Sequence, residues 1–224
     1  MPAEQARSAR LVLFDLDGTL ADTLPDLAWA LNRALAEHGL TSAADDVLRG
    51  CVSRGARAMT QAALGGRDGD GEAVLERFLE LYQDNIAVRS RLFCGMHRVL
   101  DSIDAAGLGA GVVTNKLTVF TDPLLRHLAL DGRLRCVVSG DTAARAKPHP
   151  DPLLHAALAA NVEPPRCVYV GDARGDVIAS RAAGMPVAAA CWGYLDAGDD
   201  PATWRADILL REPAQLLDWL GLVD

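Results

Sequence analysis

Residues 11–20, LVLFDLDGTL, join a run of apolar residues to two aspartates. The run LVLF is typical of a strand that is buried on both faces of a sheet. Asp15 and Asp17 follow two positions apart and point the same way, so their like charges need a cation or a proton between them. Gly18 allows a sharp turn that brings both carboxylates to one site. We therefore expect a functional site at the end of this strand.

Six short apolar runs rich in valine indicate strands, with helical patterns between most of them. Because the runs are continuously apolar and alternate with helices, they predict an α/β fold with a doubly wound, parallel, Rossmann-like sheet. Ligands of such sheets bind beyond the carboxyl ends of the strands. The predicted strands are 11–15, 109–114, 136–139, 167–171, 186–190 and 207–210.

The first two strands are separated by far more chain than a crossover helix needs. The surplus contains two amphipathic patterns, LPDLAWALNRALAEHGL (24–40) and GEAVLERFLELYQDNI (71–86). We predict an all-helical cap domain over 22–90, inserted into a core domain made of 1–21 and 91–224. Since both connections flank the site, we interpret the insertion as a lid; an insertion without a catalytic part is the alternative.

Composition excludes some classes of protein. The net charge is −8, from 22 basic and 30 acidic residues, which argues against nucleic-acid binding. We expect no membrane span, because no apolar stretch is long enough. The five cysteines show no C-x-x-C spacing, and the polar N-terminus does not resemble a signal peptide, so a cytoplasmic protein is expected. A monomer and a homodimer both remain open.

Polar side chains follow four of the predicted strands, and parallel strands bring them to one edge of the sheet. Clustered carboxylates there need a cation, and all-oxygen ligands suit Mg²⁺. Mg²⁺ with a lysine forms a positive cradle for the phosphate of a small phosphate ester. The residues concerned are Asp15, Asp17, Thr114, Asn115, Lys116, Lys147, Asp172 and Asp176.

These groups suit hydrolysis of a phosphate ester. One carboxylate of the DLD pair can attack phosphorus and form an aspartyl-phosphate, while the second can protonate the leaving oxygen and later activate water. The hydroxyl of Thr114 and the backbone N–H groups around Asp17 and Gly18 can hold the phosphoryl oxygens. Each residue taken alone also fits a purely structural role, as a turn residue, a strand terminator, a solvated lysine or a helix cap. Capping the helix that begins near Leu24 is the role we expect for Asp22.

The ordered motifs DLDGT, VVTNK, AKPHP and GDARGD resemble those of the haloacid dehalogenase superfamily of aspartate-nucleophile phosphatases, and the insertion resembles its helical C1 cap. The resemblance implies a nucleophile at Asp15 and a general acid/base at Asp17. It implies Mg²⁺ held by Asp15, the backbone carbonyl of Asp17 and Asp172, with Asp176 as a direct, water-mediated or outer ligand. The phosphate-binding residues that we predict are Gly18, Thr114, Asn115 and Lys147.

The cap is expected to select the substrate. Its loop GCVSRGARAMT (50–60) resembles the specificity loop of phosphoglycolate phosphatase-like proteins, and Arg54 there can grip a carboxylate. Arg57 is a weaker candidate that also fits a helix surface. The stretches SRGARAM and YQDNIAVRSRLFCGM resemble phosphatases that act on N-acetylmuramic acid 6-phosphate. We therefore predict a carboxylate-bearing organic phosphate as substrate, with this ester ahead of 2-phosphoglycolate.

Two other functions remain as alternatives. A phosphomutase of the β-phosphoglucomutase type would use the same Asp15 but would shield its aspartyl-phosphate from water. A non-catalytic phosphate-binding or receiver-like protein would also use clustered aspartates, threonine and lysine. A receiver, however, carries its aspartate on a middle strand and has no cap of this length.

Overall fold

The structure is a computed structural model that describes residues 2–66, 71–196 and 198–222. Its strands are β1 (Leu11–Phe14), β2 (Ala21–Asp22), β3 (Arg91–Leu92), β4 (Gly109–Val113), β5 (Cys136–Val138), β6 (Cys167–Gly171), β7 (Val187–Ala190) and β8 (Ile208–Leu210). Its α-helices are α1 (Pro2–Arg7), α2 (Leu24–Glu37), α3 (Asp45–Arg49), α4 (Ala56–Leu64), α5 (Gly71–Asp84), α6 (Met96–Ala105), α7 (Thr118–His127), α8 (Asp151–Ala159), α9 (Arg174–Ala182) and α10 (Gln215–Leu220). Short 3₁₀ turns lie at Val52–Arg54, Pro164–Arg166 and Pro201–Thr203.

The six predicted strands form one parallel sheet in the order β5-β4-β1-β6-β7-β8, which confirms the predicted fold class. The first strand, β1, lies between β4 and β6. Phe14 at its end aligns with Val112 of β4 and Val170 of β6. The residues that follow these three strands therefore emerge side by side at one edge of the sheet.

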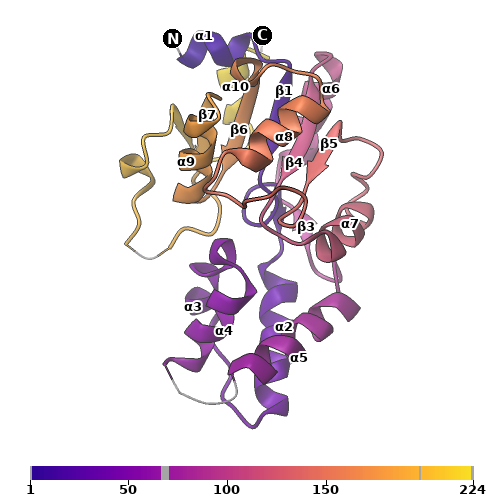
Figure 1. The fold of residues 1–224 in the computed structure, drawn as a ribbon, viewed down its shortest axis with the longest axis vertical. Coiled ribbons are helices and arrows are strands. Elements are labelled where there is room, and N and C mark those ends of the chain that lie inside the picture. Colours follow the sequence, from indigo (N-terminus) through magenta and orange to yellow (C-terminus); the bar gives the residue numbers. More distant parts are fainter. Residues whose placement is uncertain (1, 67–70, 197, 223–224) are drawn as a thin grey trace.

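Alternate side chains of each strand pack into two separate apolar cores, one on each face of the sheet. Val12 and Phe14 belong to the core that α6 and α10 cover, whereas Leu11 and Leu13 belong to the core under α8 and α9. Helix α1 packs against α10 at the far end of the sheet, where the two ends of the drawn chain lie close together (Figure 1). All five cysteines are free thiols.

Helices α2–α5 stand apart from the sheet, at the end opposite to the chain termini (Figure 1). Two of them are the predicted helices, each slightly shorter than its pattern, and α2 and α5 pack along each other. Leu31 and Leu35 of α2 and Phe78 of α5 are buried in this contact region. Over the described part of the chain, no helix is both long and apolar enough to cross a bilayer.

The chain enters and leaves this helical segment through a short antiparallel ribbon that the sequence analysis did not predict. Strand β2 pairs with β3, through Ala21 with Leu92 and Asp22 with Arg91. The buried carboxylate of Asp26 in α2 accepts hydrogen bonds from the backbone N–H groups of Arg89 and Ser90. The ribbon lies where the predicted boundaries at 21/22 and 90/91 fall, and the division into two domains itself stays a prediction.

Candidate active site

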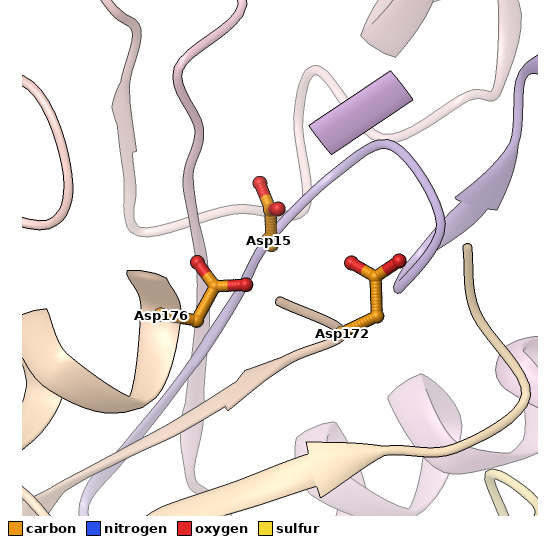
Figure 2. Close-up of side chains that lie close together, drawn as sticks. All are labelled: Asp15, Asp172 and Asp176. Carbon is orange, nitrogen blue, oxygen red and sulfur yellow. The ribbon is translucent and has the colours of Figure 1, made fainter. Parts of the chain in front are cut away.

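Three buried carboxylates meet at the edge of the sheet. Asp15 follows β1, Asp172 follows β6, and Asp176 lies in the first turn of α9. Each offers an oxygen within 4.8 Å of the other two. Figure 2 shows the three side chains pointing to the same side of the strands. The structure thus brings together three of the four predicted metal residues by their side chains.

Lys147 is buried among these carboxylates and is not a solvated surface lysine. Its Nζ lies 3.0 Å from Asp15 Oδ1 and 2.7 Å from Asp176 Oδ1, and only 4% of its side chain is exposed. It also donates to the hydroxyl of Tyr169 at 2.7 Å and to the carbonyl of Val113 at 3.1 Å. Among the described residues, the ion pairs of this three-carboxylate cluster involve one cation, Lys147.

The charge balance of this cluster favours binding of a further cation. Burial raises the pKa of Asp15 to about 6, with Asp176 and Asp17 adding to the effect and Lys147 opposing it. Burial also raises the pKa of Asp172 well above its usual range, and the negative charges of Asp15 and Asp176 add to it. Because the donors are all oxygen atoms and the site holds excess negative charge, the residues fit a hard divalent cation such as Mg²⁺.

Asp172 is held in place by two hydrogen bonds. The hydroxyl of Thr19 donates to Oδ1 at 3.0 Å, and the backbone N–H of Tyr194 donates to Oδ2 at 2.7 Å. Gly18 has a φ of +84°, and a Cβ at this position would collide with the carboxylate of Asp172 and the ring of Tyr194. The turn after Asp17 thus requires glycine for its backbone conformation and for the close approach of Asp172.

The Asp17 carboxylate is not one of the three clustered carboxylates, and it is paired elsewhere. Its Oδ1 accepts from the hydroxyl of Thr23 at 2.6 Å, and both its oxygens accept from Lys116 Nζ at 3.0 and 3.1 Å. Burial acts to lower the pKa of Lys116, but the interactions with Asp17 and Tyr82 together outweigh burial, and the pKa is raised. Lys116 was expected at this edge of the sheet as part of the motif VVTNK but had no predicted role, and no local signal pairs it with Asp17, which lies 99 positions away.

Thr114 and Asn115 lie after β4, as predicted, but they make different contacts. The buried Thr114 Oγ1 accepts the N–H of Lys116 at 3.2 Å, and Thr114 belongs to the lining of the cavity above the cluster. Asn115 accepts the N–H of Lys147 and donates to its carbonyl, both at 3.0 Å. The amide of Asn115 thus holds the backbone of Lys147, and phosphate binding by Asn115 stays a prediction.

Tyr169 is a site residue that the sequence analysis missed. It lies inside β6 and is fully buried, with its hydroxyl 2.9 Å from the carbonyl of Val113 and 3.2 Å from Asp176 Oδ1. A tyrosine in an otherwise apolar strand needs a buried partner for its hydroxyl, and this was the available signal.

A cavity of about 560 Å³ opens between the carboxylates and helices α2–α5. Its floor includes Asp15 and Lys147, and its far wall is largely apolar, with Met59, Leu75 and Phe78. Two buried hydroxyl oxygens in this lining, Ser53 Oγ and Tyr82 OH, have no hydrogen-bond partner among the described residues. The cavity therefore combines a charged floor with a largely apolar wall.

Arg54 lies in the cavity lining, as predicted, and contacts the opposite side of the cavity. Its Nη2 is 3.6 Å from Asp196 Oδ2 and 3.0 Å from the sulfur of Cys51, and its side chain is 57% exposed. Arg57 also reaches the lining, but its guanidinium forms two hydrogen bonds, at 2.7 and 3.0 Å, with Glu72. Of these two arginines, Arg54 therefore has the weaker ion pair.

Asp22 does not cap α2, and this expectation was wrong. The N-cap residue of α2 is Thr23, and the hydroxyl of Tyr194 accepts the N–H groups of Thr23 and Leu24 at 2.7 and 2.8 Å. Asp22 instead accepts a hydrogen bond from the same hydroxyl. A residue more than 170 positions away supplies the cap, which no local pattern indicates.

Known proteins with similar sequences are hydrolases and phosphatases. The model of the haloacid dehalogenase-like hydrolases matches residues 12–190. A phosphoglycolate phosphatase from Xanthomonas campestris is 43% identical over 94% of this chain and 96% of its own. An N-acetylmuramic acid 6-phosphate phosphatase from Pseudomonas aeruginosa is 40% identical over 94% of both chains.

The solved structures agree with the predicted fold. A predicted phosphoglycolate phosphatase from Haemophilus somnus has a TM-score of 0.86 at 28% identity, over 94% of this chain and 97% of its own. Relatives of both predicted branches are thus found at similar identity, and the prediction of a phosphoric monoester hydrolase is confirmed. The chain belongs to the haloacid dehalogenase-like hydrolase family.

Proposed function

We propose that this hydrolase is a Mg²⁺-dependent phosphatase of carboxylate-bearing organic phosphates that works through an aspartyl-phosphate on Asp15. The observation that carries the proposal is the joining of a buried carboxylate–lysine cluster to a large, capped cavity. The preferred substrate is N-acetylmuramic acid 6-phosphate, with 2-phosphoglycolate second. The cytoplasm remains the predicted location, and a monomer and a homodimer remain open.

Asp15 is the proposed nucleophile because it lies on the cavity floor with one oxygen held. Its Oδ1 accepts from the N–H of Leu16 at 2.7 Å and faces Lys147, which leaves Oδ2 for attack on phosphorus. The new bond joins this oxygen to phosphorus while the bond from phosphorus to the leaving oxygen breaks. Lys147 and the hydroxyl of Thr114 then neutralise charge on the phosphoryl oxygens.

Asp17 is the proposed general acid and base. It protonates the leaving oxygen and later takes a proton from the water that hydrolyses the aspartyl-phosphate. Its carboxylate now binds Thr23 and Lys116, so each proton transfer requires this side chain to leave Lys116 and turn toward Asp15. Binding of a phosphate, which competes for Lys116, favours that movement.

Mg²⁺, held by Asp15, Asp172 and the backbone carbonyl of Asp17, would polarise the phosphoryl group and orient it for attack. Asp176 is the weakest of the predicted ligands. Its Oδ1 faces Lys147 and Tyr169, and its Oδ2 accepts the N–H of Ala173. We therefore propose that Asp176 acts from outside the first ligand shell, by holding Lys147.

The size and lining of the cavity favour the larger ester. A volume of about 560 Å³ is in the range of sites that enclose a ligand of drug size. The two-carbon acid 2-phosphoglycolate would leave the apolar wall of Met59, Leu75 and Phe78 without contact. A sugar with an N-acetyl group is large enough to contact this wall.

Arg54 is the proposed partner of the substrate carboxylate. We would measure kcat/KM for N-acetylmuramic acid 6-phosphate, 2-phosphoglycolate and N-acetylglucosamine 6-phosphate, which is the first sugar without its lactyl carboxylate. The wild type should prefer the muramic ester, and Arg54→Gln should lower that preference by at least about tenfold.

Arg77→Gln is the matched control, because Arg77 is a cap arginine that pairs on the surface with Glu37 and Glu80. It should leave the preference unchanged. Feeble and equal rates of the wild type on all three esters would refute the proposed substrate class. The phosphomutase alternative predicts instead that turnover requires a sugar bisphosphate.

A further inference from the structure

Tyr194 connects the carboxylate cluster to the start of the cap. It lies in the core chain after β7 and is 2% exposed. Its backbone N–H donates to Asp172 Oδ2 at 2.7 Å. Its hydroxyl accepts the first two N–H groups at the start of α2, those of Thr23 and Leu24, and donates to Asp22 in β2. One residue thus binds a predicted metal ligand with its main chain and the cap entrance with its side chain.

The ring of Tyr194 is also held from the cap side. The guanidinium of Arg49, at the end of α3, lies 5.3 Å from the ring centroid. The ring of Phe93, where the chain returns to the core, meets it edge-on at 6.3 Å between centroids. Two residues further, Asp196 forms the ion pair with Arg54. The segment 194–196 therefore contacts the cap at its entrance and at its specificity loop.

The main chain of this segment has little room to shift relative to Asp172. A Cβ at Gly193 would collide with Asp172 and with the carbonyl of Gly18, and a Cβ at Gly18 would collide with Asp172 and Tyr194. Close packing of this kind transmits a displacement, because neither partner can move alone. A change in the position of Asp172 therefore reaches the hydroxyl of Tyr194 and the first turn of α2.

We propose that Tyr194 is a positioning residue that couples occupancy of the carboxylate cluster to the orientation of the cap. It does not touch the phosphate; it acts through Asp172 on one side and the N-terminus of α2 on the other. The proposal rests on the proposed Mg²⁺ site for its trigger. A cation on Asp172 fixes its carboxylate, hence the Tyr194 backbone, and hence the acceptor of the Thr23 and Leu24 N–H groups.

The test is amide hydrogen exchange at Thr23 and Leu24 in the whole protein, with and without Mg²⁺. In the wild type, Mg²⁺ should slow exchange of these amides by at least about tenfold. Tyr194→Phe keeps the ring and the N–H that binds Asp172, and it removes the hydroxyl. The variant should still bind Mg²⁺, as measured by the rise in Tm, but the effect of Mg²⁺ on Thr23 and Leu24 should be lost.

A kinetic arm separates positioning from mere stabilisation of the fold. In Tyr194→Phe, kcat/KM for N-acetylmuramic acid 6-phosphate should fall at least about tenfold, whereas that for acetyl phosphate, whose leaving group is too short to reach the cap, should change less than about twofold. Ser180→Ala is the control, since it deletes a buried hydroxyl that bonds the carbonyl of Met185 in the core. It should leave both rates and the exchange pattern unchanged.

Equal losses of kcat/KM on both substrates in Tyr194→Phe would overturn the coupling. So would an effect of Mg²⁺ on exchange at Thr23 and Leu24 that is the same in this variant as in the wild type. If the wild type bound no Mg²⁺, both the proposed Mg²⁺ site and the coupling would be refuted. If it bound Mg²⁺ but exchange at Thr23 and Leu24 did not slow, only the coupling would be refuted. If Tyr194→Phe did not fold, Asp22→Asn would replace it. That change weakens the acceptor of the Tyr194 hydroxyl and should reduce the Mg²⁺ effect in the same direction.

Discussion

Replacement of Lys147 by methionine tests the electrostatic account of the site most directly. Lys147→Met keeps the length of the side chain and removes the charge that faces Asp15 at 3.0 Å and Asp176 at 2.7 Å. It also removes the donor to the Tyr169 hydroxyl and to the Val113 carbonyl. Taking one partner from a buried ion pair costs about 3–5 kcal/mol of unfolding free energy, because the other charge stays buried without compensation.

The size of this loss should depend on what else neutralises the carboxylates. We expect the full loss in metal-free protein near neutral pH and a smaller loss with saturating Mg²⁺, which offers a second positive charge. The loss of unfolding free energy should also be smaller at about pH 5. At that pH Asp15, whose pKa is raised to about 6, is largely protonated and no longer needs the positive charge of Lys147. Urea unfolding of wild type and variant under these three conditions measures each difference.

Activity supplies a second measurement on the same variant. Loss of a fixed charge on the phosphoryl oxygens should lower kcat by about 10² to 10³ even when Mg²⁺ saturates the enzyme. A stability loss below about 1 kcal/mol in metal-free protein, or a loss that is the same with and without Mg²⁺, would contradict the account. Arg77→Met is the control for loss of a cap cation, whose ion pairs are on the surface.

Four further outcomes are expected. Asp15→Asn should abolish turnover while the protein stays folded, as measured with the preferred ester; residual kcat near that of the wild type would rule Asp15 out as nucleophile. Folding raises the pKa of Asp15 to about 6, so the contribution of this group to stability is greatest below its pKa in the unfolded chain and is lost as pH rises through about 6. The Tm of the metal-free protein should therefore fall between about pH 5 and pH 7.5, and Mg²⁺ should raise Tm more at the higher pH. Gly18→Ala should cost about 1–3 kcal/mol and weaken Mg²⁺ binding, since its φ is +84° and its Cβ would collide with Asp172; an unchanged Mg²⁺ titration would count against this. Tyr169→Phe should lose about 1–3 kcal/mol in urea unfolding, because it leaves Asp176 and Lys147 with one partner fewer, and a neutral change would show that its hydroxyl is dispensable.

The sequence by itself determined the sheet and four charged residues of the site. Continuous apolar runs predicted all six strands of the parallel sheet, and the four central strands, β4, β1, β6 and β7, are continuously apolar because both their faces are buried. The polar residues that end these strands had to converge at one edge, so the grouping of Asp15, Lys147, Asp172 and Asp176 followed from the chain alone.

The tertiary structure decided which of these groups pair. Asp17 binds Lys116, 99 positions away, and Asn115 holds the backbone of Lys147. Tyr194 caps a helix 170 positions before it. Each pairing depends on the distance and direction between side chains on different strands and on the cap, and residue type and spacing carry no information on either. Local pattern therefore predicts where charged groups gather, and only packing assigns their partners.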